Sequence, residues 1–383
     1  MKHCRPHPAF VALLFLLPLA VSAEAPPEDD KKPEVVQKTT LADKFKFFGY
    51  INVAYGETDR HQYRGATPSG TFDFRSAALQ ARFEATPNTE FVLQLANESV
   101  GDSPSNEFRD DLELDWLFVK HRFRNGTSIR LGRVPLPIGI YNEIKDVGTA
   151  LPFFRPSDNF YGEGTWTSDS VDGVVVSHNF AADSGWDINL DFYYGEWERI
   201  ESDGVDRRYA QAEISDAIGI FTWVTTPWNG VRVGFGYNEF EATGGAFLDP
   251  GATDQENTRY LSFDGTWDPV TFRFETSRRN FTGGYWNPYY AELSVQVASK
   301  VRLNAVYDVG KLYYAIPFFA TFDDKIEELW GLSVNYEFRP GIVAKLEQRW
   351  TSTLGQVEDV SVNMFFDEPL DIELTLASVA FSF

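Results

Sequence analysis

The stretch Phe45–Tyr55, "FKFFGYINVAY", decides how this chain folds. Successive side chains of a β-strand point to opposite sides, so alternate positions share one face. One face carries Phe45, Phe47, Gly49, Ile51, Val53 and Tyr55, and the other carries Lys46, Phe48, Tyr50, Asn52 and Ala54. An apolar face backed by a mixed, partly charged face predicts an amphipathic strand.

The same two-residue period recurs along the chain, for example over 79–85, 91–98, 112–118 and 186–194, with ionised residues on the less apolar face. Seven tight turns, such as Arg124-Asn125-Gly126, alternate with eight longer polar segments. The longer segments lie near 58–71, 100–110, 135–168, 199–208, 243–257, 281–287, 315–327 and 354–370. We therefore expect about sixteen strands, with both termini on the side of the short turns, as in bacterial outer-membrane barrels.

The first 44 residues differ from the rest. Residues 1–23 combine a basic start, an apolar run from Ala9 to Val21 and small residues before a cleavage point, which is the layout of a signal peptide. The acidic, proline-containing stretch 24–44 shows no sustained period, so we expect a flexible periplasmic lead-in before a barrel over 45–383. The lone cysteine, Cys4, falls inside the signal peptide. We predict an exported protein that is stable without disulfides.

Composition narrows the choice further. The formal net charge is -22, which makes nucleic acid an unsuitable partner. No later segment approaches the roughly 20 consecutive apolar residues of a membrane helix. The mean hydropathy of -0.29 looks soluble, yet 16% of the residues are aromatic. This combination is expected when each strand has one lipid-facing side and one wet side, because the average hides the alternation.

Three all-β architectures can use amphipathic strands. A soluble sandwich with this many strands needs a very large two-layer core or several domains, and no linker divides the chain. A solenoid needs a fixed sequence repeat, which we do not find. A barrel closed in a bilayer pairs every backbone group and has no sheet edge. We therefore expect an all-β, transmembrane antiparallel β-barrel.

The chain ends on "AFSF" (380–383), with Phe383, Phe381 and Val379 on one face. Apolar residues at 372, 374 and 376 have the opposite parity, so we expect the apolar face to switch near Leu376 through a bulge. Residues 357–366 also alternate, but a further strand would make the count odd, so we assign them to the last long loop. The terminal aromatic resembles the C-terminal signature of outer-membrane barrel proteins, which implies that Phe383 serves recognition by the barrel assembly machinery.

The longest interruption of the strand pattern spans 135–168, and its four prolines exclude a regular strand. A segment this long is seldom an idle connection, so we expect it to fold inward as the third loop and narrow the lumen. The candidate constriction residues are Arg130, Arg133, Glu143, Lys145, Asp146, Arg155, Asp158 and Glu163. The candidate pore-wall residues are Arg82, Glu84, Glu98, Glu113, Asp115, Arg273, Arg302, Lys345 and Glu347. Opposed charges across a narrow pore favour dipolar, hydrated solutes, although each of these charges can also be an ordinary solvated one.

Three stretches resemble the general bacterial porins and, more narrowly, the phosphate-selective porins and their uncharacterised relatives. These are "FFGYINVAYGE" (47–57), "LGRVPLPIGIYNEIKD" (131–146) and the terminal "AFSF". The resemblance implies a trimeric, sixteen-stranded pore in the outer membrane of a Gram-negative bacterium. Phosphate selectivity in that family is associated with ladders of arginine and lysine. This chain is acidic, so the resemblance does not carry the substrate over.

These observations predict a porin for passive diffusion of small hydrophilic solutes or ions, with weak cation preference or little selectivity. The expected partners are outer-membrane lipid, the solutes, the barrel assembly machinery and two further copies of the chain. We expect no cofactor and no enzyme activity, because the mature chain has only three histidines and no G-x-S-x-G motif. Acidic pairs such as Asp323-Asp324 are either solvated or weak calcium sites. The alternative is a plugged or adhesin-like barrel whose inward charges pair and block the lumen. Deleting 137–163 should raise conductance if this segment lines the constriction.

Overall fold

The computed structural model describes residues 40–109, 112–162, 170–181, 184–202, 209–245, 251–316, 320–355 and 357–383. The predicted signal peptide and nearly all of the predicted lead-in therefore lie outside the described residues. A short 3-10 helix, η2 (Ala42–Lys44), precedes the first strand, which begins at Phe45. The period-two pattern in the sequence starts at the same residue.

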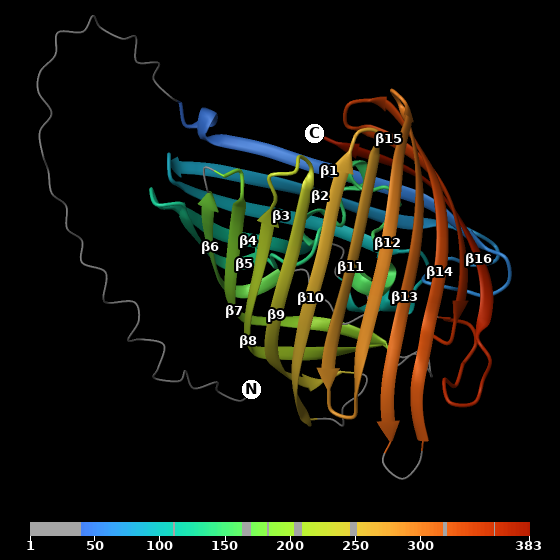
Figure 1. The fold of residues 1–383 in the computed structure, drawn as a ribbon. Helices are drawn as coiled ribbons and strands as arrows, with labels where there is room; N and C mark the ends of the chain where they lie inside the picture. Colours follow the sequence, from blue (N-terminus) through green and yellow to red (C-terminus); the bar gives the residue numbers. More distant parts are fainter. Residues whose placement is uncertain are drawn as a thin grey trace, which may run out of the picture. The chain divides into compact units, whose positions relative to one another are not determined.

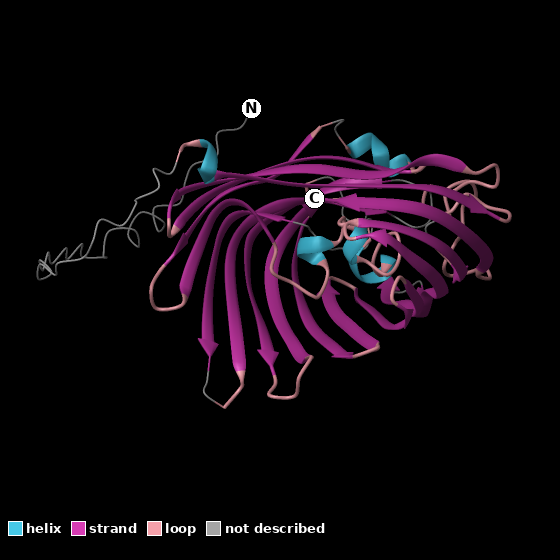
Figure 2. Cartoon of the chain, turned by 90° about the horizontal axis from the view of Figure 1, so that it is seen from above, coloured by secondary structure: helices cyan, strands magenta, loops and turns pink. Residues whose placement is uncertain are grey.

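Within the described residues, sixteen antiparallel strands form one closed sheet, and each pairs with its neighbours in sequence (Figures 1 and 2). The strands are β1 (Phe45–Thr58), β2 (Thr71–Thr86), β3 (Thr89–Val100), β4 (Glu113–Arg122), β5 (Thr127–Pro135), β6 (Ser170–Ala181), β7 (Asp187–Ser202), β8 (Tyr209–Thr225), β9 (Val231–Gly244), β10 (Thr253–Trp267), β11 (Val270–Phe281), β12 (Gly284–Ala298), β13 (Val301–Ile316), β14 (Ala320–Arg339), β15 (Ile342–Thr353) and β16 (Leu370–Ser382). The prediction of a sixteen-stranded antiparallel barrel is confirmed.

The first and last strands close the barrel. Their register runs without a break from Tyr50 opposite Ser382 to Thr58 opposite Leu374. The backbone amide of Phe383 donates to the carbonyl of Gly49, and the amide of Gly49 donates back to Phe383. No edge of the sheet is left open, which is the condition for a β-structure in lipid.

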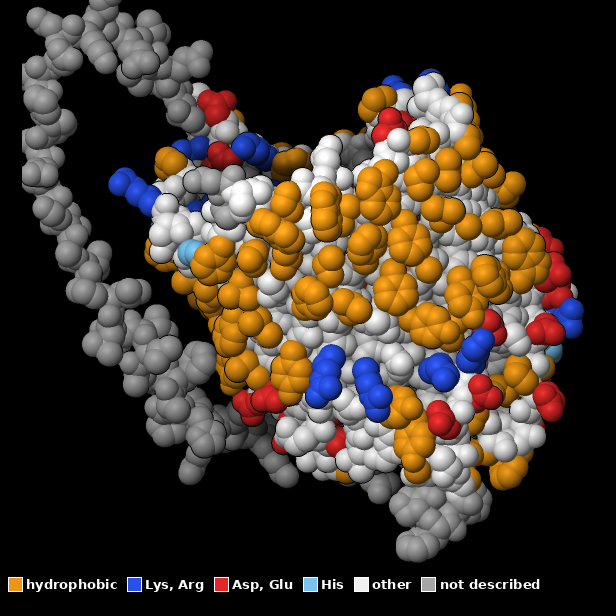
Figure 3. Space-filling view, in the orientation of Figure 1, with side chains coloured by type: hydrophobic (Ala, Val, Ile, Leu, Met, Phe, Trp, Pro, Cys, Tyr) orange, Lys and Arg blue, Asp and Glu red, His pale blue; other side chains and the backbone are white. Residues whose placement is uncertain are grey.

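The two faces of β1 follow the predicted alternation. Ile51 and Val53 are 49% and 46% exposed on the outside, whereas Asn52 between them is 1% exposed on the inside. Other exposed apolar residues on the outer face include Leu79, Leu131, Phe235, Leu332 and Leu346. Figure 3 shows apolar side chains covering the outer face over β9–β14. A belt of this kind is stable only against hydrocarbon or another apolar surface.

Short and long connections separate to opposite ends of the barrel, as predicted. Gly230 has φ 79° in the turn between β8 and β9, and a Cβ there would meet the carbonyl oxygen of Thr266. This turn therefore needs glycine. The predicted loop over 281–287 is wrong, because β11 and β12 extend through it and leave only residues 282 and 283 between them. The predicted loop over 315–327 is wrong as well, because β13 runs to Ile316 and β14 begins at Ala320.

Four long connections matter below: L1 (59–70), L2 (101–112), L3 (136–169, described to residue 162) and L8 (354–369). They contain the 3-10 helices η3 (Pro104–Phe108) in L2, and η4 (Asn142–Ile144) and η5 (Gly148–Ala150) in L3. L3 also contains the single-turn helix α1 (Asp158–Tyr161). Residues 357–366 belong to L8 and contribute only an isolated bridge between Val357 and Tyr63, as predicted. No helix in the described part of the chain is long and apolar enough to cross a membrane.

The predicted face switch in β16 is wrong. Its pairings with β1 and β15 show no register shift, so the alternation continues without a bulge. Ile372, Leu374 and Leu376 face inward and are at most 4% exposed. They pack with residues of L1, L3 and L8, including Tyr63, Phe154 and Val357, in one buried apolar cluster. The inner face is apolar here because loops cover it, and the acidic residues Asp371 and Glu373 take the outer positions.

Candidate pore and its constriction

L3 folds into the lumen, as predicted, and is fixed to the wall opposite its own strands (Figure 2). The Tyr141 hydroxyl donates to Glu292 of β12 over 2.7 Å. Arg349 of β15 donates to Asp158 in α1 over 2.6 Å. These contacts hold L3 against the half of the barrel formed by β11–β16, because both partners are buried and hydrogen-bonded there.

The backbone of L3 is anchored as firmly as its side chains. Ser333 of β14 donates to the carbonyl oxygen of Pro152 over 2.8 Å. Lys345 of β15 donates to the carbonyl oxygen of Phe153 over 2.5 Å, and the amide of Phe154 donates to Glu347. Lys345 and Glu347 are 3% and 1% exposed, so these two predicted wall residues hold L3 instead of facing open water.

A buried apolar cluster joins L3 to the inner wall. Leu136, Ile138, Leu151 and Phe160 of L3 are at most 3% exposed. They belong to one cluster with inward residues of β6–β14, including Val175, Tyr193, Phe221, Tyr290, Val306 and Leu329. Burial of each large side chain contributes roughly 1.5–3 kcal/mol. The half of the lumen that L3 covers is therefore a dry core.

Glu275 of β11 is the centre of the polar contacts under L3. It is fully buried and accepts hydrogen bonds from Ser262 Oγ (2.5 Å), the Tyr290 hydroxyl (2.5 Å), the Ile140 amide (3.0 Å) and the Tyr161 hydroxyl. Burial and the neighbouring carboxylate raise the pKa of Tyr161, so its hydroxyl stays protonated and can donate. Glu275 was not among the residues singled out from the sequence. Its inward parity was readable, but its partners were not.

The other half of the lumen contains two cavities. The larger, cavity A, is about 520 Å³ and lies between L2 and β4 on one side and β7 and β8 on the other. The smaller, cavity B, is about 260 Å³ and lies between β1–β4, residues 142–147 of L3 and the end of β16. Asp115 and Lys145 line both cavities. The two cavities therefore meet beside L3 and extend toward opposite ends of the barrel.

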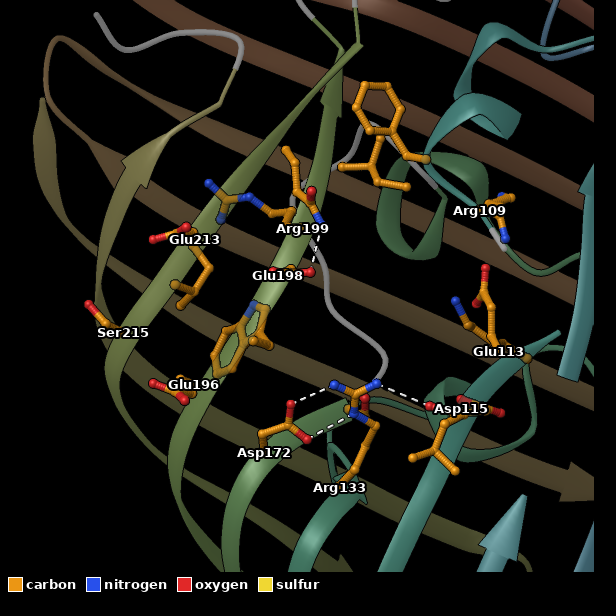
Figure 4. Close-up of a pocket in the computed structure, with 18 of the residues that line it drawn as sticks. Arg109, Glu113, Asp115, Arg133, Asp172, Glu196, Glu198, Arg199, Glu213 and Ser215 are labelled. Atoms are coloured by element: carbon orange, nitrogen blue, oxygen red, sulfur yellow. Dashed lines mark hydrogen bonds and ion pairs between the residues drawn. The ribbon is translucent and has the colours of Figure 1, made fainter. Parts of the chain in front are cut away.

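Charged side chains line both cavities. Figure 4 shows Glu113 and Asp115 on β4 across from Glu196, Glu198 and Glu213 on β7 and β8, with the Arg133–Asp172 ion pair between the two groups. Cavity A has six carboxylates and four basic side chains in its lining. Cavity B has three carboxylates, on Asp115, Glu143 and Asp146, and two basic side chains, on Arg82 and Lys145. Acidic groups are in the majority in both.

The structure brings some of the predicted constriction residues together and separates others. Glu143, Lys145 and Asp146 lie on cavity B, and Arg130 contacts Glu143 over 3.1 Å. Arg155 and Asp158 line a further small cavity together with Lys145 and Asp146; there Arg155 pairs with Glu98, and Asp158 pairs with Arg349. Arg133 lies apart from this group, because it lines cavity A and pairs there with Asp172 over 2.6 Å. Glu163 lies outside the described residues.

The predicted wall residues also divide. Arg82, Glu113 and Asp115 line the cavities. Glu98 pairs with Arg109 as well as with Arg155. Three more have these partners: Glu84 pairs with Lys46, Arg273 pairs with Glu292 and Asp264, and Arg302 donates to Gln296. Within the described residues, no group of three or more His, Cys, Asp or Glu side chains is arranged to hold a metal ion.

The mouth at the long-loop end is partly covered where L1, L2 and L8 meet. The Glu358 carboxylate of L8 accepts from the Gly65 amide of L1 over 2.8 Å and from Ser103 Oγ of L2 over 2.6 Å. Arg64 of L1 reaches Glu327 of β14 over 2.8 Å. Burial raises the pKa of Glu358. These contacts were not foreseen, because they join loops that are far apart in sequence.

Comparisons with known proteins identify the fold. No family model and no curated protein matches the chain. Solved structures that resemble it include OmpF of Salmonella typhi in complex with daunomycin, at TM-score 0.61 and 11% identity over 88% of this chain and 97% of that one. The anion-selective porin from Comamonas acidovorans has TM-score 0.58 and 12% identity over 88% and 99%. The outer-membrane channel DcaP of Acinetobacter baumannii has TM-score 0.56 and 8% identity over 88% and 97%.

At these identities the likeness concerns the fold. The closed barrel, its apolar belt and these neighbours define a porin-like β-barrel of the Gram-negative outer membrane, so the predicted fold and location are confirmed. The narrower likeness to phosphate-selective porins gains no support, because these neighbours are several kinds of porin and channel.

Proposed function

We propose that the protein is a passive diffusion channel for small hydrophilic solutes and ions. The observation that carries this proposal is the pair of cavities that meet at Asp115 and Lys145. Because L3 is fixed to the β11–β16 half, the route for solutes runs off-centre, along β1–β4 in cavity B and past Asp115 of β4 into cavity A. Water and ions enter a charge-lined channel of this kind more easily than apolar solutes do.

The narrow point of the route is formed by Glu143, Lys145 and Asp146 of L3 facing Arg82 and Asp115 of the wall. Acidic groups outnumber basic ones along cavity B, with three carboxylates against two basic side chains, which supports a weak preference for cations. No cofactor or catalytic group has a part in this mechanism. The specificity for a natural solute is then set by size and by the transverse field between these side chains.

Trimerisation belongs to the same proposal. One of the similar structures, OmpT of Vibrio cholerae, is described in a trimer form, at TM-score 0.56 and 13% identity over 88% of this chain and 99% of that one. A homotrimer would cover part of the apolar belt of each barrel. The mass of the detergent-solubilised particle, measured by light scattering with the detergent subtracted, tests it; a particle with the mass of one chain contradicts it.

A plugged barrel without channel activity is the second candidate. The joined L1, L2 and L8, together with the dry core under L3, favour it. Planar-bilayer recording separates the two functions. A channel gives stepwise currents, and a plugged barrel leaves the bilayer silent.

The narrow point is tested by Lys145→Glu. The matched control is Lys300→Glu, which makes the same charge change in an exposed periplasmic turn that lines neither cavity. We expect the reversal potential in a salt gradient to move toward the equilibrium potential of the cation in Lys145→Glu and to stay unchanged in Lys300→Glu. Stepwise currents with equal reversal potentials in both variants would support channel activity but would show that Lys145 does not line the narrow point.

A further inference from the structure

A row of four basic residues follows the outer surface of the barrel. Arg259 of β10 lies directly opposite Arg278 of β11, and Lys311 of β13 lies directly opposite Lys325 of β14. Between the two pairs, β12 contributes Asn287, the register partner of Lys311. The outer row therefore crosses five consecutive strands without a break.

The outer row lies at the boundary of the apolar belt. Leu261 is the next outward position of β10 toward the short-turn end, and Tyr307 lies four residues further in that direction along β13, where it packs on Trp330 with ring centroids 4.3 Å apart. Figure 3 shows Lys and Arg side chains gathered along the lower edge of the apolar face over these strands. The long loops lie at that end, so the row is at the level of the outer leaflet's head groups.

Like charges placed directly opposite each other across a sheet repel. Arg259, Arg278 and Lys311 are exposed and, within the described residues, form no ion pair with an acidic side chain. Only Lys325 has a carboxylate, from Glu328 at 2.7 Å. Four aligned cations with one acidic partner leave a strongly positive strip that an external anion can neutralise.

The geometry of the strip suits phosphate. The Arg278 guanidinium lies over the Tyr285 ring at 3.8 Å, and its Nε donates to Asn280, so the group is held in place at the surface. Arginine binds phosphate through two parallel hydrogen bonds, and lysine adds a point charge. An acidic protein partner would have to reach the row through the head-group layer, whereas a lipid head group is already at this depth.

We propose that the outer row binds the phosphorylated head group of a lipid in the outer leaflet. The acyl chains of that lipid lie along the apolar belt below the row, and its phosphate groups bridge the opposed cations. This binding offsets the repulsion between Arg259 and Arg278 and fixes the depth of the barrel in the membrane. The inference does not depend on channel activity.

The test uses the purified mature chain in a neutral detergent, with native mass spectrometry to count bound lipid. The probe is bis-phosphorylated lipid A, and phosphatidylcholine is the comparison lipid. The variant Arg259→Gln/Arg278→Gln removes half of the row. The matched control, Arg124→Gln/Arg339→Gln, removes two exposed arginines at the other end of the barrel, one in a short turn and one at the end of β14.

Each basic residue near an anionic lipid surface contributes on the order of 1 kcal/mol, so we expect the first double variant to bind lipid A roughly 10- to 30-fold more weakly. The control should bind as the unaltered protein does. If the first variant does not fold, Lys311→Gln/Lys325→Gln gives the same test on the other half of the row. Equal lipid A binding by the unaltered protein and a folded row variant would overturn the proposal. Phosphatidylcholine binding as tight as that of lipid A would also overturn the proposal. So would displacement of lipid A by inorganic phosphate at a concentration equal to that of the lipid phosphate groups, because this would indicate a site for free anions.

Discussion

The replacement Glu275→Ala tests whether L3 is held in the lumen by the polar contacts described above. The Glu275 carboxylate accepts from four buried or half-buried donors: Ser262 Oγ, the Tyr290 hydroxyl, the Ile140 amide and the Tyr161 hydroxyl. Alanine leaves all four donors without this acceptor. The Ile140 amide keeps one partner, because it also donates to the Tyr161 hydroxyl over 2.8 Å.

The magnitude follows from the other three donors, which are Ser262 Oγ and the hydroxyls of Tyr161 and Tyr290. A buried donor left without a partner costs about 1–3 kcal/mol, so the loss of three partners should lower the free energy of unfolding by about 3–9 kcal/mol. Water that enters the new space brings the value toward the lower end of this range. Because two of the donors belong to L3, we also expect a noisier and larger single-channel current.

Two further variants sharpen the assay, in which unfolding of the reconstituted barrel by urea is followed by circular dichroism. Glu275→Gln keeps the volume and one acceptor oxygen, so it should lose less stability than alanine does. Glu84→Ala removes an inward glutamate whose partner is the exposed Lys46, and an exposed ion pair contributes at most about 1 kcal/mol. If Glu275→Ala unfolds at the same urea concentration as Glu84→Ala, and with unchanged current noise, the reasoning about L3 is refuted.

Three other predictions concern different parts of the barrel. Burial raises the pKa of Glu358 above its ordinary value, so the junction of L1, L2 and L8 is most stable where this carboxyl is protonated and loosens as the pH rises through the raised pKa. Channel closures should therefore become rarer over that pH range, and Glu358→Gln should abolish this pH dependence. An unaltered pH dependence in the variant would assign it to another group. The ring of Phe383 packs on Phe381, with centroids 5.6 Å apart, where β1 and β16 close the barrel. Phe383→Ala should therefore reduce the amount of folded barrel recovered from outer membranes. An undiminished yield would show that Phe383 is not an assembly signal. Gly49 faces this ring, and a Cβ there would lie 2.7 Å from it. Gly49→Val should therefore lower the free energy of unfolding by about 1–3 kcal/mol in the urea assay, and an unchanged value would contradict this close packing.

The outer face of the barrel was predictable from the sequence because lipid contact leaves a regular pattern. Ile51 and Val53 must face hydrocarbon whatever the rest of the chain does, so the period of two alone identifies the strand. The inner face has no such rule. Ile372 and Leu374 are apolar because L1 and L8 cover them, and that covering depends on contacts between residues far apart in sequence. The predicted bulge in β16 resulted from applying the outer rule to an inner position.

The candidate site was predictable to a smaller extent, for the same reason. The prolines of L3 predicted that it leaves the sheet, and the structure places Glu143, Lys145 and Asp146 at a cavity. Parity also indicated that Lys345 and Glu347 point inward. Parity did not indicate that L3 covers Lys345 and Glu347. An inward charged residue has the same place in the sequence pattern whether water or a loop backbone lies beside it.

This distinction changes what removal of L3 would do. Deletion of 137–163 was expected simply to raise conductance, as if L3 were an obstacle in an open lumen. Glu275, Lys345 and Arg349 instead have L3 atoms among their partners and are at most 5% exposed. Without L3, the charges on these wall residues lose compensation, and water must enter the barrel to solvate them. A larger current in the deletion variant is therefore expected only together with a lower free energy of unfolding. A deletion variant as stable as the unaltered protein would show that the wall does not need L3.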